Sequence, residues 1–174
     1  MKFKKYSYNI VKSTNDVSLR KIKLKKKQGI IISNTQTSGR GRYGKHWISI
    51  KGNLFMSIFY KINNNTKLNK ITKNNCKIIK RAIAKFINKK ITIKAPNDLL
   101  INSQKFCGIL QETCFNENSK FLIIGIGINV VGCPQINNYP TTYLNKYTKK
   151  RVDKLKIFKT IKQMFEKNLN KKKL

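Results

Sequence analysis

Residues 33–57 read SNTQTSGRGRYGKHWISIKGNLFMS, and the rest of the chain is organised around this stretch. One apolar run, residues 30–32, leads into it, and a second, residues 54–60, leads out of it, so we expect a strand on each side. Within residues 39–45, three glycines are interleaved with two arginines and a lysine. Glycine lets a backbone pass close to a ligand, and guanidinium and ammonium groups bind phosphate or carboxylate. The composition of this loop therefore indicates an anion-binding site between two strands.

The chain is strongly basic: 39 Lys and Arg residues stand against 6 Asp and Glu residues, which gives a net charge of +33. Such a charge is typical of proteins that bind nucleic acid, an anionic membrane or an acidic protein. The chain is also rich in Asn and Ile, as are proteins encoded by AT-biased genomes. We therefore attribute most of the lysine excess to compositional drift on solvated faces, with some non-specific affinity for polyanions remaining.

The cysteine and histidine content argues against a zinc site. None of the cysteines, Cys76, Cys107, Cys114 and Cys133, forms a C-x-x-C pair, and His46 is the only histidine. A lysine-rich chain without a disulfide framework fits a reducing cytoplasm. No apolar core follows the basic start, and no apolar stretch has the length of a membrane span, so we expect neither a signal peptide nor a membrane-spanning segment.

The spacing of apolar residues predicts strands with a few helices between them. Ser13 and Asp16 have the spacing of a capping box, which predicts that a helix starts there. Helical spacing also predicts helices over residues 71–87 and 152–169. We expect strands at residues 3–10, 30–32, 54–60, 91–93, 99–101, 106–114 and 121–131, with a hairpin turn at residues 102–105 and residues 121–131 as a central strand. This order predicts an α+β fold, a mixed β-sheet backed by helices.

Four segments, in this order, resemble biotin–protein ligases. They are KSTND at residues 12–16; TQTSGRGRYGKHWIS at residues 35–49, followed by GNL; KAPNDLL at residues 94–100 with GILQE at residues 108–112; and IGIGINV at residues 124–130. The YPTTYL segment at residues 139–144 is similar to the loop before the last helix of that family's catalytic domain. The resemblance covers nearly the whole chain and implies the class II synthetase-like fold of the biotin and lipoate ligases.

The resemblance also implies roles for individual residues. It makes Lys94, Arg40 and Arg42 the catalytic residues, which stabilise the charge that develops when a carboxylate meets the α-phosphate of ATP. Asp98 is a candidate contact for magnesium, but the resemblance leaves the metal ligands unassigned. The implied biotin-binding residues are Ser13, Thr14, Asn15, Gln36, Gly39, Arg40, Gly41, Arg42, Lys94 and Gly108. The implied nucleotide-binding residues are Arg42, Trp47, Lys94, Asn97 and Asn129. By pattern alone, plainer roles also fit: a helix cap for Ser13, core packing for Trp47 and a surface position for Lys94.

The chain departs from the family pattern in three places. Ala95 stands where the family usually has Trp after the lysine, Tyr43 replaces a frequent basic residue, and Ile50 replaces a proline. We expect residues 1–174 to form a single catalytic domain, with no DNA-binding domain before it and without the β-barrel domain that follows it in many relatives. Specific DNA binding is therefore not expected.

The function that the resemblance implies is that of a biotin–[acetyl-CoA-carboxylase] ligase. Such an enzyme uses biotin and Mg-ATP to form biotinyl-5′-AMP, and then transfers biotin to a lysine of the biotin carboxyl carrier protein. The expected partner is an acidic carrier domain, the expected location is the cytoplasm, and a homodimer is kept as an option. Three alternatives stay open: a lipoate or octanoate ligase of the same superfamily, a basic nucleic-acid-binding module, and a decayed ligase that binds without turnover.

Overall fold

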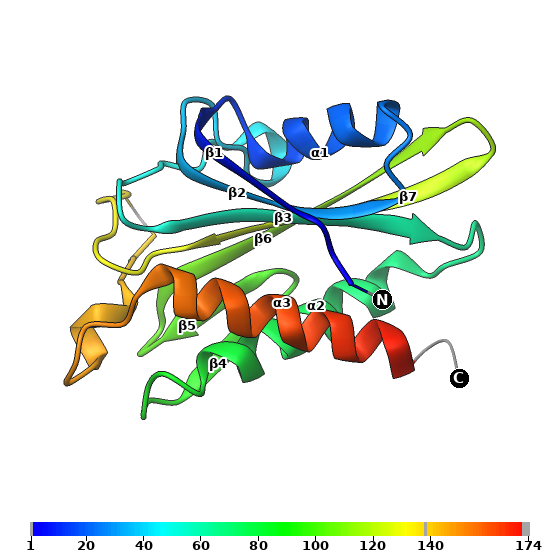
Figure 1. The fold of residues 1–174 in the computed structure, drawn as a ribbon. Coiled ribbons are helices and arrows are strands. Elements are labelled where there is room, and N and C mark those ends of the chain that lie inside the picture. Colours follow the sequence, from blue (N-terminus) through cyan, green and yellow to red (C-terminus); the bar gives the residue numbers. More distant parts are fainter. Residues whose placement is uncertain (1, 138, 172–174) are drawn as a thin grey trace.

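The computed structural model describes residues 2–137 and 139–171 (Figure 1). Within these residues, seven strands form one sheet in the order β1-β2-β3-β7-β6-β5-β4. The strands are β1 (Lys5–Val11), β2 (Gln28–Gln36), β3 (Leu54–Ile62), β4 (Ile91–Lys94), β5 (Asp98–Ile101), β6 (Gln104–Asn116) and β7 (Ser119–Ile128). The helices are α1 (Thr14–Lys23), α2 (Leu68–Ile83) and α3 (Lys154–Lys171), with 3-10 turns η1 (Arg42–Gly44) and η2 (Leu144–Tyr147).

The sheet is mixed, as predicted. β1 and β2 pair in parallel, and the other neighbouring strands pair antiparallel. The predicted central strand corresponds to β7, which lies in the middle of the strand order. The predicted hairpin is also confirmed: β5 and β6 are joined by Asn102 and Ser103, whose φ angles of 49° and 61° match those of a tight hairpin turn.

Helices cover both faces of the sheet. α1 lies on one face, and α2 and α3 lie side by side on the other (Figure 1). Because β3 runs between these layers, residues 54–60 are all buried, without an exposed polar face. Ile79 and Ile83 of α2 and Ile157 and Ile161 of α3 are fully buried against this sheet. The α+β prediction and the two helices predicted by spacing are therefore confirmed.

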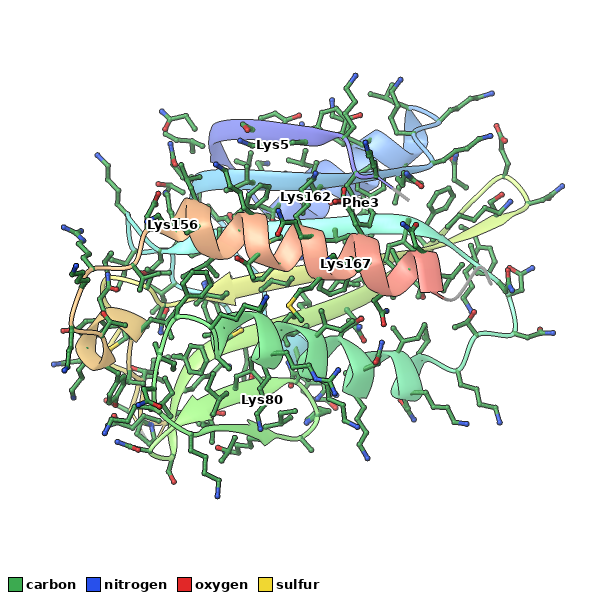
Figure 2. The ribbon with its side chains drawn as sticks, turned by 60° about the horizontal axis from the view of Figure 1, so that its bottom comes forward. Phe3, Lys5, Lys80, Lys156, Lys162 and Lys167 are labelled. Atoms are coloured by element: carbon green, nitrogen blue, oxygen red, sulfur yellow. The ribbon has the colours of Figure 1, made fainter. Side chains whose placement is uncertain are left out.

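The outer surfaces of α2 and α3 are basic. Lys156 and Lys167 are exposed on α3, and Lys80 is half-buried on α2 (Figure 2). The opposite sides of the same helices carry the buried isoleucines, so each helix is amphipathic and its lysines remain in solvent. Part of the lysine excess thus lies on the outer faces of these two helices.

The capping box predicted at Ser13 and Asp16 forms only in part. Ser13 is the N-cap of α1, and its hydroxyl accepts a hydrogen bond from the Asn15 backbone N–H at 3.2 Å. Asp16 instead forms an ion pair with Arg40. The predicted start of the helix is confirmed. The prediction of a reciprocal capping-box contact is wrong, because the Asp16 carboxylate has a cationic partner from another segment.

One end of the sheet collects the segments that the sequence singles out. β1, β2 and β7 end there, while β3 and β6 begin there, as the pairs Val11↔Gln36, Leu54↔Ile128 and Cys107↔Ile128 indicate. Residues 37–53, which connect β2 to β3, therefore emerge beside the start of α1 and the start of β6. Antiparallel pairing brings segments that are far apart in the chain to one edge.

The packing of α2 against the sheet predicts how substitutions in this helix change the free energy of unfolding. Ile79→Ala should lower the free energy of unfolding by about 2–5 kcal/mol, because it opens a cavity in the core. Leu68→Ala, in the same helix but with its side chain at the surface, should change it by less than about 0.5 kcal/mol. Urea unfolding of both variants measures the difference, and equal losses would contradict the packing of α2 against the sheet.

Candidate active site

The first turn of α1 forms one wall of the site. Gln36, at the end of β2, accepts hydrogen bonds from the Thr14 backbone N–H at 2.9 Å and from the Thr14 hydroxyl at 3.1 Å. The Ser57 hydroxyl of β3 lies 2.5 Å from Asn15 Oδ1 and 2.7 Å from the Thr14 hydroxyl. Ser13, Thr14 and Asn15 are buried, so this polar network holds them in place beneath the cavity.

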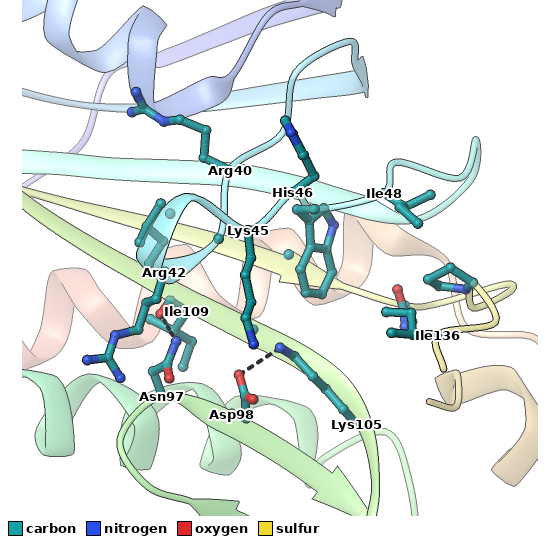
Figure 3. A pocket seen from close by; sticks show the side chains of 18 of the residues that line it. Arg40, Arg42, Lys45, His46, Ile48, Asn97, Asp98, Lys105, Ile109 and Ile136 are labelled. Carbon is teal, nitrogen blue, oxygen red and sulfur yellow. Dashed lines mark hydrogen bonds and ion pairs between the residues drawn. The ribbon is translucent and has the colours of Figure 1, made fainter. Parts of the chain in front are cut away.

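Arg40 fastens the glycine-rich loop to two other elements. Its Nη1 lies 3.0 Å from Asp16 Oδ1, and its Nη2 lies 2.8 Å from Glu112 Oε2. Glu112 of β6 also accepts a hydrogen bond from Asn15 Nδ2 at 2.6 Å. The Arg40 side chain therefore points towards α1 (Figure 3). Its charge faces two carboxylates, which suits an anchor for the loop.

The remainder of the loop folds back over the sheet. The Gly41 backbone N–H donates to Lys45 O at 2.6 Å, and the Trp47 N–H donates to Gly39 O at 2.8 Å. These bonds place the indole of Trp47 on Gly108 of β6 and Gly127 of β7, which face each other in the sheet. A Cβ atom at Gly127 would lie 2.5 Å from the indole, and one at Gly108 would lie 2.7 Å from it. The ring can rest there only because neither residue has a side chain.

A cavity of about 940 Å³ lies between this loop and the α1 face of the sheet (Figure 3). Most of the residues that the resemblance assigned to biotin or nucleotide line it. They are Ser13, Thr14, Asn15, Gln36, Arg40, Gly41, Arg42, Trp47, Asn97, Gly108 and Asn129. The lining is mainly apolar, with a few polar and charged groups, as is common in small-molecule sites.

Two residues that the resemblance assigned do not line this cavity. Gly39 is buried behind it, where a Cβ atom would meet Trp47 O at 2.5 Å. Lys94 is exposed at the end of β4, and its Nζ lies 4.5 Å from the centroid of the Tyr139 ring. Arg40 and Arg42 therefore both line the cavity, whereas Lys94 lies beside Tyr139 and is not among the lining residues.

Two lysines that the sequence reasoning did not assign do line the cavity. Lys45 reaches down from the loop and Lys105 reaches in from β6, both towards Asp98 (Figure 3). The Nζ of Lys105 lies 3.0 Å from Asp98 Oδ1 and 5.5 Å from the centroid of the Trp47 ring. The sequence signal for Lys105 is its place at the start of β6, three residues before Gly108. The sequence prediction instead places Lys105 in the hairpin turn at residues 102–105, whereas the structure starts β6 at Gln104.

Two asparagines on the cavity wall have protein partners. Asn97 Nδ2 donates to Ile109 O at 2.8 Å, and Asn97 O accepts from the Ile109 N–H at 3.0 Å. Asn129 Nδ2 donates to Thr142 O at 3.1 Å. Both amides therefore fix loops to the sheet, and Asn129 Oδ1 also accepts a hydrogen bond from Asn53 Nδ2 at 3.3 Å.

Within residues 2–137 and 139–171, no three His, Cys, Asp or Glu side chains gather where they could hold a metal ion. None of the helices in the described parts of the chain is long and apolar enough to cross a membrane.

The mixed sheet, with helices on both faces and a cation-lined cavity at one end, defines a class II synthetase-like catalytic domain. The chain belongs to the biotin/lipoate A/B protein ligase family, whose model matches residues 7–129. It is 32% identical over 147 residues to the bifunctional ligase/repressor BirA of Bacillus subtilis, covering 79% of this chain and 45% of that protein. It is 32% identical over 127 residues to the BirA of Escherichia coli, covering 70% of this chain and 39% of that protein. The chain thus spans less than half the length of these curated relatives.

Solved structures give the same fold. The biotin protein ligase of Aquifex aeolicus, solved with biotin and ATP, matches with a TM-score of 0.79 and 25% identity over 97% of this chain and 71% of that one. The Leishmania major biotin protein ligase, solved with biotinyl-5-AMP, matches with a TM-score of 0.78 and 24% identity over 92% of this chain and 72% of that one. The predicted fold class and family are confirmed.

The contact between Trp47 and the sheet can be tested by fluorescence, because Trp47 is the only tryptophan. Gly127→Ala should displace the indole and shift its emission towards that of a solvated ring, since the new methyl group would lie 2.5 Å from it. In Gly132→Ala, where the nearest atom to a new Cβ is 3.9 Å away, the spectrum should stay unchanged. Identical spectra for the two variants would contradict the packing.

Proposed function

We propose that this chain activates biotin with ATP and transfers it to a lysine of the biotin carboxyl carrier protein. The observation that carries the proposal is the cavity of about 940 Å³, in which Arg42, Lys45 and Lys105 line one pocket with the first turn of α1. Its size suits a small acid joined to a nucleotide. The curated relatives include biotin–protein ligases, and the Aquifex aeolicus relative was solved with biotin and ATP.

In the first step, a carboxylate oxygen of biotin attacks the α-phosphorus of ATP. A new P–O bond forms, the bond to the β-phosphate oxygen breaks, and pyrophosphate leaves with its electron pair. Two anions must approach each other, so the barrier falls when fixed cations face the developing charge. Lys105 and Lys45 provide ammonium groups at the cavity, and Arg42 provides a guanidinium group.

In the second step, the neutral amine of a carrier lysine attacks the carbonyl carbon of biotinyl-5′-AMP. The C–N bond forms, AMP leaves with the electrons of the C–O bond, and the amine proton passes to solvent. A cysteine nucleophile is not needed, and the nearby thiols are poorly suited to the role. Burial, with the nearby negative charge of Asp98, raises the pKa of Cys76 to about 11, and Cys107 is fully buried with its pKa raised in the same direction. Both remain thiols near neutral pH.

We propose Lys105 as a second candidate, beside Lys94, for the lysine that contacts the reacting carboxylate and phosphate. Lys105 lines the cavity and is held by Asp98, whereas Lys94 lies outside it. A lysine contributes a compact charge at a defined point only if its flexible side chain is anchored. The Asp98 carboxylate anchors Lys105 between turnovers, and the incoming biotin carboxylate would replace it as a partner.

Magnesium would enter with ATP in this proposal. The only carboxylate on the cavity wall within the described residues, Asp98, already contacts Lys105 and Tyr139. The phosphates of the nucleotide, together with waters, would therefore supply most of the ligands for the ion.

The charge of the chain suits an acidic carrier domain. No Asp or Glu occurs between Asp16 and Asp98, although this segment contains the loop and α2. Opposite charge on the carrier would speed diffusional encounter. A cytoplasmic setting belongs to the same proposal. A homodimer is also part of the proposal, because β1 lies at an edge of the sheet and could pair with β1 of a second copy.

The family also includes lipoate ligases, so substrate choice needs a direct measurement. Biotin should support ATP–pyrophosphate exchange. The kcat/KM for lipoate or octanoate should be lower than that for biotin by about 100-fold or more. Preference for lipoate would identify the chain as a lipoate ligase, and no exchange with any of the acids would indicate a protein that binds without turnover.

The assignment of Lys105 predicts how exchange responds to mutation. Lys105→Ala should lower kcat by about 100-fold or more, because a charge that faces the transition state is lost. Lys90→Ala, an exposed lysine just before β4, should leave the rate unchanged.

Lys94→Ala, assayed in parallel, compares the two assignments. A large loss in Lys94→Ala with an active Lys105→Ala would return the role to Lys94.

Electrostatic steering is tested separately by salt. The second-order rate of biotin transfer to an acidic carrier domain should fall by about tenfold or more between 20 and 200 mM salt. Exchange of pyrophosphate, which needs no carrier, serves as the control. A transfer rate that does not depend on ionic strength would argue against an acidic partner surface.

A further inference from the structure

One carboxylate oxygen of Glu112 is shared by two parts of the site. Glu112 Oε2 accepts a hydrogen bond from Asn15 Nδ2 at 2.6 Å and another from Arg40 Nη2 at 2.8 Å. Glu112 Oε1 lies 3.1 Å from the same guanidinium nitrogen. Asn15 belongs to the first turn of α1 and Arg40 to the glycine-rich loop, so a single side chain of β6 holds both segments.

The Asn15 amide is held from three strands. Its Nδ2 donates to Glu112 of β6, and its Oδ1 lies 2.5 Å from the Ser57 hydroxyl of β3. The amide also rests on Gly125 of β7, where a Cβ atom would lie 2.6 Å from Asn15 Oδ1. Asn15 is buried, and a buried donor without an acceptor is costly. Glu112 therefore determines which way this amide faces.

Arg40 stands at the base of a small hairpin. It pairs with His46 across an isolated β-bridge, so the tip of the loop, residues 41–45, extends beyond it. In Figure 3 the Arg40 side chain points towards α1, whereas Arg42 and Lys45 point away from α1. The guanidinium group therefore fastens the base of the hairpin and leaves the cations of the tip directed into the cavity.

The contact of Arg40 is stronger than an ordinary surface ion pair. Its guanidinium group meets two carboxylates, those of Glu112 and Asp16, and the Arg40 and Glu112 side chains are 40% and 32% exposed. At the other end of β6, Lys25 and Glu117 form a single pair whose side chains are 79% and 67% exposed. Networks of partly buried charges hold a side chain in place more firmly than isolated exposed pairs.

We propose that Glu112 is a positioning residue, which fixes the Asn15 amide and the base of the loop through one carboxylate. It thereby sets the loop at a defined place beside the first turn of α1. Glu112 itself is not among the residues that line the cavity, so it acts through Asn15 and Arg40. Its effect on activity rests on the proposed function, whereas the position of the loop can be measured without turnover.

The first experiment measures how accessible Trp47 is in the ligand-free protein. Trp47 follows the tip of the loop and is the only tryptophan of the chain, and acrylamide is a neutral quencher that collides with accessible indoles. In Glu112→Gln, the negative charge that faces Arg40 is lost, and the loop should open more often. The Stern–Volmer quenching constant should therefore rise by about twofold or more.

The matched control is Glu117→Gln, the same substitution at the other end of β6. It removes the ion pair with Lys25 and should leave the quenching constant unchanged. Melting temperatures show whether each variant is folded. If Glu112→Gln does not fold, Asp16→Asn weakens the same anchor from α1 and should raise the constant instead. An unchanged quenching constant in the folded variant would overturn the proposal.

The route through Arg40 has its own test. Arg40→Gln should also raise the quenching constant, because the base of the hairpin loses its anchor. Adding Glu112→Gln to Arg40→Gln should change the constant by less than about 1.3-fold, since the two substitutions remove the same contact. Independent effects of the two substitutions would contradict this route.

The second experiment separates positioning from a general effect on structure. Glu112→Ala leaves Asn15 without its acceptor and should raise the KM for biotin in pyrophosphate exchange by about tenfold or more. Glu112→Gln keeps an oxygen that can accept from Asn15, so it should raise this KM by about threefold or less. In both variants kcat should fall by less than about threefold, because bound ligand closes the loop at saturation.

A large loss of kcat with an unchanged KM for biotin would contradict a positioning role. If the wild type shows no exchange with any acid, the proposed function fails, and the quenching of Trp47 still decides the role of Glu112.

Discussion

The contact between the Trp47 indole and a pair of facing glycines is the constraint on which the site depends. Gly108 and Gly127 come from neighbouring antiparallel strands and leave a bare patch on the sheet. A side chain at either position would overlap with the ring. Because the ring rests on this patch, the loop that carries it lies over the sheet and encloses a cavity. Gly108, Gly127 and the loop residue Gly39 therefore allow close approach, whereas Gly44 of the loop has open space around it and a φ angle of 72° that favours glycine.

The few carboxylates of the chain are concentrated at the site. Asp16, Asp98 and Glu112 are half of the six acidic residues, and each one pairs with Arg40 or Lys105. The lysines on the outer helix faces reflect the overall composition of the chain, whereas these ion pairs lie at specific positions in the site. Arg40 with its two carboxylates fastens the loop, whereas Asp98 holds Lys105 at the cavity.

Most of the fold could be predicted from the sequence, because burial imposes clear periods on the chain. The runs that became β3 and β7 are apolar on both faces, which fits strands between two helical layers. The amphipathic spacing of apolar residues predicted both α2 and α3, and Ser13 predicted the start of α1. The capping box was wrong in part, since local spacing does not reveal that Arg40 would attract Asp16.

The sequence by itself was sufficient to identify the family, the glycine pattern and the residues of the loop. Each of these motifs consists of residues that are adjacent in the chain, so it can be recognised without knowledge of the fold. Only the tertiary structure decided which lysine faces the cavity. Lys94 ends β4 and Lys105 lies near the start of β6, and spacing alone does not show which of them faces a cavity. The pairing of β5 with β6 and the ion pair with Asp98 place Lys105 at the cavity, whereas Lys94 is not among the residues that line it. That choice depends on contacts between segments distant in sequence, which no local pattern encodes.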